Sequence, residues 1–279
     1  MGVTVRLGDM EINSAVQEFG DLTQRPGGGE QPRSIKLAAG SETGELVQVF
    51  RNARQIAFDV LGPQHLFGGA GPWYRWQISD SLIQLEHHSW GVRLSLLPKD
   101  ETENTEYQAC EWGDRDHVVA EVGIWVAEFD NGGMWNGYSP GGVGAPDWKT
   151  FQQWATETLH TLESDLTILD TRMSILLTPV RGDARSIQVL VEPGTISAVA
   201  SQPHHLDRQV LGSLGWQTAH DDTWFAVHEK PNQTDIQKLA GLITDTLRAY
   251  AVDLNQVKYS TTCPHSSWIN LLGLGLGHL

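Results

Sequence analysis

The chain has 279 residues, of which 40% are hydrophobic and 19% charged, so it is long enough for two globular domains and is neither disordered overall nor embedded in a membrane. A formal net charge of -15 without clustered lysine and arginine excludes a nucleic-acid partner and favours basic or apolar partners. Cys110 and Cys263 have no metal or redox spacing, no stretch is long enough to span a bilayer, and the N-terminus has no secretory pattern. We therefore expect a cytoplasmic protein with no cofactor and no membrane partner.

The first half of the chain predicts an α+β unit behind a flexible N-terminal arm. The arm is expected because the segment Arg25 to Glu30, RPGGGE, has little to bury. From Glu45 to Leu61 apolar residues recur at helical spacing, and Gly62-Pro63 ends that helix. Alternating patterns then predict antiparallel strands at 74–78, 82–87 and 90–96.

The pattern continues with more strand-like material and a second helix. Residues 106–112 and 118–129 are expected to be strands, and 131–144 a long glycine-rich loop. Pro146-Asp147 then begins a helix with one apolar stripe.

The second half predicts a hairpin followed by two helices. Strands at 186–192 and 195–200 flank the turn Pro193-Gly194, and a helix at 206–214 ends at Gly215. After a short strand at 223–228, Thr234 and Gln237 form a capping-box pattern before the last helix.

These elements predict an α+β fold of twisted antiparallel sheets with helices packed on one face, in two related-looking domains. We expect four parts: a flexible arm at 1–43, an N-terminal α+β domain at 44–170, a second α+β domain at 171–260, and an apolar C-terminal tail at 261–279. The tail would pack either on its own chain or on a partner, because an exposed apolar segment is sticky.

The segment Leu211 to Val252 carries a resemblance to a known family. Its Leu214-Gly215-Trp216, its Asp222-Thr223-Trp224 and its helix LAGLITDTLRAYAV resemble the YbjN-like and type III secretion chaperone-like (TY-Chap) domains of actinobacterial proteins. Thr223 stands where this pattern has asparagine. The resemblance implies a sheet backed by helices that holds peptides or protein segments, often as a homodimer, although fold alone does not establish activity.

Several patterns are candidates for catalysis or metal binding. Gly137 to Gly141 matches G-x-S-x-G around Ser139, but both flanks are loop-like, where a hydrolase needs a strand and a helix. The pairs His87-His88 and His204-His205 each point to opposite faces of a strand, and Cys263 with His265 lacks a second pair of zinc ligands. Asp221-Asp222 is expected to form a turn and not a catalytic carboxylate pair. The sequence therefore predicts no catalytic residue and no metal.

The tryptophans are the remaining candidate site. Most are expected in the core, but an aromatic groove for a peptide is the functional alternative. The candidate groove residues are Trp76, Trp90, Trp125, Trp216 and Trp224.

Together these features predict a non-catalytic, chaperone-like module that binds a protein or peptide client. Two alternatives stay open. An immunity protein would use the acidic surface to mask a basic toxin, and a serine hydrolase would use Ser139, which a fluorophosphonate probe would label.

Overall fold

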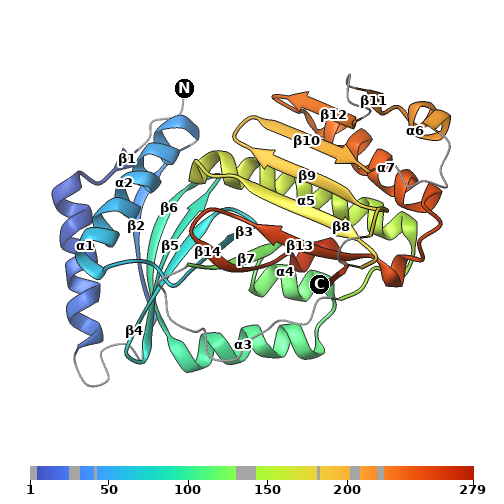
Figure 1. The fold of residues 1–279 in the computed structure, drawn as a ribbon. Coiled ribbons are helices and arrows are strands. Elements are labelled where there is room, and N and C mark those ends of the chain that lie inside the picture. The colour runs from blue at the N-terminus through green and yellow to red at the C-terminus, as the bar shows by residue number, and fades with distance from the viewer. Residues whose placement is uncertain are drawn as a thin grey trace.

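The computed structural model describes residues 5–24, 32–40, 43–129, 143–180, 183–201, 208–218 and 223–279. Two sheets with packed helices form the molecule, which confirms the predicted α+β class (Figure 1). Apolar side chains from both halves join in one continuous core.

The first sheet has the strand order β1-β2-β6-β5-β4-β3-β7-β14. All of its pairings are antiparallel, and the predicted strands at 74–78, 82–87 and 90–96 are its centre. Its strands are β1 (Val5–Arg6), β2 (Arg33–Ala39), β3 (Leu66–Gly69), β4 (Trp73–Ile78), β5 (Ser81–His88), β6 (Gly91–Pro98), β7 (Trp125–Phe129) and β14 (Ser266–Asn270).

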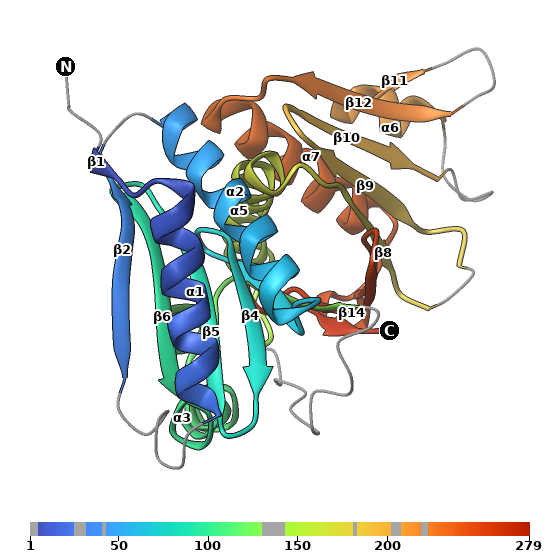
Figure 2. The same cartoon turned by 90° about the vertical axis from the view of Figure 1, so that its left-hand side faces the viewer.

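Helices α1 (Asp9–Thr23) and α2 (Thr43–Leu61) cover one face of this sheet (Figure 2). The predicted apolar spacing of α2 is its buried stripe, which includes Leu46, Phe50 and Ala57. The expected flexible arm at 1–43 is wrong for its described residues, because α1 buries Ile12, Phe19 and other apolar side chains and β2 pairs with β6. The helical spacing within 9–23 was the signal for this.

Two further helices, α3 (Lys99–Trp112) and α4 (Arg115–Glu121), cover the opposite face. Residues 106–112 and 118–121, which the pattern predicted as strands, are helical. The first turn of α3 contains Asp100 and Glu101, whose negative charges stabilise a helix N-terminus. Its Glu106 is buried against Arg75 of β4, so the acidic stretch is a helix with a charged inner contact.

The second sheet has the order β11-β12-β10-β9-β8-β13-β15. The predicted hairpin at 186–200 is confirmed as β9 and β10, and the short pairing of β13 with β15 is parallel. Its strands are β8 (Met173–Thr178), β9 (Ile187–Glu192), β10 (Thr195–Ala200), β11 (Gln217–Thr218), β12 (Trp224–Glu229), β13 (Lys258–Thr262) and β15 (Gly277–His278).

Three helices accompany the second sheet (Figure 1): α5 (Trp148–Leu169), α6 (Arg208–Leu214) and α7 (Gln233–Ala249). Asp147 caps α5 by accepting the Thr150 N–H at 2.8 Å, as the Pro146-Asp147 start predicted. The capping box of α7 is formed by Asn232 and Asp235, two residues before the predicted pair. Gly215 ends α6 with a φ of 110°, as its position predicted.

The C-terminal residues join the two sheets. Strand β13 lies in the second sheet and β14 in the first, with a short turn between them. The 3-10 helices η1 (Leu254–Gln256) and η2 (Leu272–Leu274) flank these strands. Leu271, Leu274 and Leu276 are buried, so the apolar tail at 261–279 packs on its own chain. None of the described helices is long and apolar enough to cross a membrane.

Candidate functional site

A groove of about 570 Å³ lies between α7 and the end of the second sheet. Helix α7 contributes Lys238, Leu242 and Asp245, and the sheet contributes Ala226 and Val227 of β12. The groove thus combines apolar side chains with one positive and one negative charge, and both charges lie on α7.

Strand β12 is open beside this groove. Strand β11 pairs only with Trp224 and Phe225, whereas β10 pairs with the whole of β12 on its other side. A longer β11 would place Gly215 opposite Val227. Because Gly215 has a left-handed conformation, the chain turns away from β12 at this position.

The hydrogen-bonding direction of β12 follows from its register with β10. The Lys230 N–H donates to the Gly194 carbonyl, and Ala226 and His228 alternate with it in the same ladder. Because successive residues of an antiparallel strand alternate their hydrogen-bonding direction, Val227 directs its N–H and C=O groups away from β10. This edge can accept a further strand.

Trp216 and Trp224, two of the predicted groove residues, are buried and do not line the groove. The Trp216 Nε1 donates to the Thr246 Oγ1 of α7 at 2.7 Å. Its neighbours Gly215 and Gln217 line the groove instead. The groove is lined by residues of the segment to which the sequence pointed, while the two tryptophans themselves lie in the core.

Trp76 and Trp125 are fully buried in the first half of the chain. The Trp76 Nε1 donates to the Gly62 carbonyl at the end of α2, at 2.9 Å. The Trp125 Nε1 donates to the Asp165 Oδ2 of α5, also at 2.9 Å. Both are core residues in this structure and contribute no surface to a groove.

Trp90 is 45% exposed and lies in the turn between β5 and β6. Its ring stacks on His88 with centroids 4.6 Å apart, and the Lys36 Nζ lies 5.0 Å from its centroid. Trp90 lines a second cleft, between α5 and the first sheet, and not the groove at β12. The five predicted tryptophans therefore do not form one binding surface.

The pH dependence of stability offers a test of the Asp165 environment. Burial raises the pKa of this carboxyl to about 7, well above the value of about 3.9 in an unfolded chain. A raised folded-state pKa stabilises the protein at low pH, and this contribution is lost as the pH rises through 7. Asp165→Asn lacks this loss, so its free energy of unfolding relative to wild type should rise between pH 5 and pH 8 in urea titrations.

Glu163→Gln is the matched control, since it removes a carboxyl from the same helix at a partly exposed position. The pH dependence of Asp165→Asn is compared with that of this variant. A constant difference for Asp165→Asn would contradict the raised pKa.

Ser139 with its G-x-S-x-G pattern, His204-His205 and Asp221-Asp222 lie outside the described residues. His87 packs its ring against Phe50, with centroids 5.7 Å apart. Within the described ranges, no three His, Cys, Asp or Glu side chains gather as metal ligands.

A helix-backed sheet with an open edge strand beside a groove is an arrangement that proteins use to bind extended segments. Residues 142–259 match the family model TY-Chap3, described as T3SS (YopN, CesT) and YbjN peptide-binding chaperone 3. Residues 142–259 are therefore similar to this family, and the matched segment includes the Leu211 to Val252 region whose resemblance predicted it. The search of curated proteins and the search of solved structures each find no match.

The family match begins before α5, whereas the sequence pattern assigned that helix to the first domain. Helix α5 packs along α7 and contributes Gln152 to the groove. The sequence missed the groove because its lining depends on the short length of β11, which no periodic pattern encodes.

Proposed function

We propose that this protein is a chaperone-like module that binds an extended peptide or protein segment in the groove between β12 and α7, without chemical conversion. One observation carries the proposal: every residue that lines the groove lies inside the segment that matches a peptide-binding chaperone family.

The open edge supplies the main-chain part of the recognition. A bound segment would pair with β12 at Val227 and extend the second sheet by one strand. Main-chain hydrogen bonds of this kind give affinity with little dependence on sequence.

The groove supplies the side-chain part. Alternate residues of a bound strand would point toward α7, where Leu214 and Leu242 offer apolar contact. Lys238 and Asp245 are seven residues apart on α7, which places them two turns apart on one side of the helix. A client with apolar residues at alternate positions and flanking charges fits this surface.

Removing the edge donor should weaken binding. Val227→Pro deletes an N–H directed away from β10 and places a ring against an incoming strand, so we expect a loss of affinity of about tenfold or more. Peptides would be selected on the wild-type protein from a random 12-residue library and their dissociation constants measured by fluorescence polarisation.

Val227→Thr is the matched control, because it keeps both the N–H and the β-branched shape. It should bind the selected peptides as the wild type does. Equal affinity of Val227→Pro, with a melting temperature equal to that of Val227→Thr, would contradict strand addition at this edge.

A further inference from the structure

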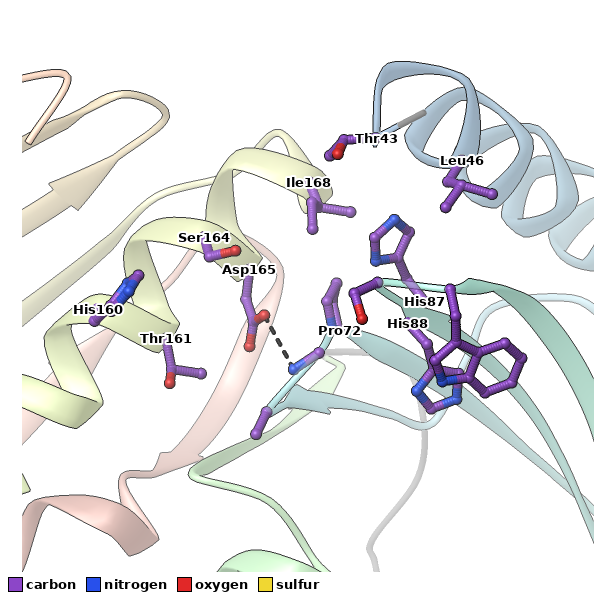
Figure 3. A pocket seen from close by; sticks show the side chains of 14 residues that line it. Thr43, Leu46, Pro72, His87, His88, His160, Thr161, Ser164, Asp165 and Ile168 are labelled. Atoms are coloured by element: carbon purple, nitrogen blue, oxygen red, sulfur yellow. Dashed lines mark hydrogen bonds between the residues drawn. The ribbon is translucent and has the colours of Figure 1, made fainter. Parts of the chain in front are cut away.

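A cleft of about 490 Å³ separates α5 of the second half from the first sheet. Figure 3 shows Asp165 on the α5 side of this cleft and His87 and His88 on the β5 side. Leu46 of α2 and Ile168 of α5 make part of the lining apolar. This cleft is separate from the groove at β12.

The carboxylate of Asp165 is buried without a positively charged partner among the described residues. It is 2% exposed and accepts two neutral donors, the Trp125 Nε1–H at 2.9 Å and the Gly71 N–H at 3.2 Å. A buried carboxylate is costly unless a positive charge compensates it.

The backbone of the first sheet is shaped to receive this carboxylate. A Cβ atom on Gly69 would collide with the Asp165 Oδ2, so any larger residue there would displace the carboxylate. Gly71 adopts a φ of 85° at the turn that presents its N–H. The site is built into the fold and does not result from a chance surface contact.

His87 adds an unused hydrogen-bonding atom to the same cleft. The side chain is 5% exposed, and its Nε2 is buried with no hydrogen-bond partner. Burial and the neighbouring His88 lower its pKa, so the ring is neutral at pH 7 and one nitrogen carries an acceptor lone pair. Buried polar atoms without partners are rare in folded proteins.

The charged groups on the surrounding elements do not neutralise Asp165. Arg51 of α2 donates to the carbonyls of Ile168 and Thr167 at the end of α5. Arg54 of the same helix lies over the Tyr74 ring, and Glu86 of β5 pairs with Arg93. His88 and His160 complete the titratable lining, and neither lysine nor arginine occurs among the described residues of the cleft.

We propose that this cleft binds a small ligand through a primary ammonium group, which donates to Asp165, while His87 offers a second hydrogen-bond acceptor in the same lining. The ammonium supplies the missing positive charge, and Leu46 and Ile168 contact its alkyl part. Anionic ligands are disfavoured, because a second negative charge would face the carboxylate. The volume suits a ligand of amino-acid or diamine size.

Three isosteric probes test the charge requirement on the full chain: 1,4-diaminobutane, 1,4-butanediol and succinate. The readout is the indole N–H resonance of Trp125, which donates directly to Asp165. The diamine should shift this resonance saturably, and the diol and succinate should not. Equal shifts with all three probes, or none with the diamine and none with the peptide probe described below, would overturn the proposal.

Two variants link the binding to Asp165. Asp165→Asn should weaken diamine binding at least tenfold, and Glu163→Gln should leave it unchanged. Thr161→Lys places an ammonium one turn before Asp165 on the same face of α5, so it should abolish diamine binding and raise the melting temperature at pH 8. Unchanged diamine affinity in Thr161→Lys would contradict the site even where Asp165→Asn fails to fold.

The pH profile distinguishes a carboxylate site from general association. A diamine stays charged below pH 9, whereas a proton on Asp165 competes with it. The affinity should therefore rise with pH by a factor approaching ten per unit and level off above pH 7. A flat profile across pH 5 to 8 would count against Asp165 as the acceptor.

A last arm identifies the source of the ammonium group. Triglycine amide carries a peptide α-amino group, and its N-acetyl form is the neutral control. Stronger binding of the free peptide than of the diamine would indicate a peptide amino terminus, and the reverse a small amine. The Trp125 resonance reports on the cleft at Asp165, so this test fails or succeeds independently of the groove at β12.

Discussion

Trp216→Ala should lower the free energy of unfolding by about 3–5 kcal/mol, the range for removing a large aromatic side chain from a core. Trp216 is 4% exposed, and it holds the end of α6 against α7 through its hydrogen bond to Thr246. The loss also leaves the Thr246 hydroxyl with only its bond to the Leu242 carbonyl. Urea denaturation followed by circular dichroism measures this change.

Trp112→Ala is the control, because this tryptophan is 83% exposed on α3 and its removal should change stability by no more than about 0.5 kcal/mol. A Trp216→Ala protein as stable as the control variant would refute the buried position. A double alanine variant at Trp216 and Trp224 would lose binding through unfolding, so it cannot test a groove.

The elements that the sequence predicted correctly are those whose pattern is local. The apolar spacing of α2 and the alternating runs of β9 and β10 each bury one face, so composition and period suffice to identify them. The Pro193-Gly194 turn and Gly215 are equally local, because each depends on the backbone freedom or restriction of one residue type.

Helix α3 shows where local pattern is insufficient. Its residues include glutamate, threonine and tyrosine without a continuous apolar stripe, and the segment from Glu106 to Trp112 resembled a strand. Its position depends on Glu106 meeting Arg75, a residue 31 positions earlier on β4. Contacts between distant residues of this kind leave no periodic signal.

The candidate sites depend on distant contacts in the same way. In the sequence, Asp165 is one polar residue of an amphipathic helix. Its contacts with Gly71 and Trp125 are visible only in the folded structure. The tryptophans were conspicuous by residue type, but four of the five are structural. Large aromatic residues are more often core than surface.

The buried pair of Arg75 and Glu106 should be the most sensitive polar contact in the first half. The guanidinium donates to both carboxylate oxygens, at 3.0 and 2.6 Å, and its Nε donates to the Gln84 Oε1 at 2.8 Å. Glu106→Gln removes the carboxylate that pairs with this buried guanidinium in a bidentate way, so it should destabilise the protein by about 3–5 kcal/mol. Thermal and urea denaturation check this value.

A double variant separates the cost of an unpaired charge from the value of the pair itself. Replacing both residues by apolar ones of similar size, Arg75→Met with Glu106→Leu, removes two buried charges together and should recover most of the stability lost in Glu106→Gln. Glu111→Gln, at an exposed position of the same helix, is the control and should remain near wild type. If Glu106→Gln matched this control, the pair would not be what holds α3 on the sheet. If the double variant stayed as unstable as Glu106→Gln, the pair itself would be stabilising, and α3 would depend on a charge contact more than on the apolar contacts around Cys110 and Val118.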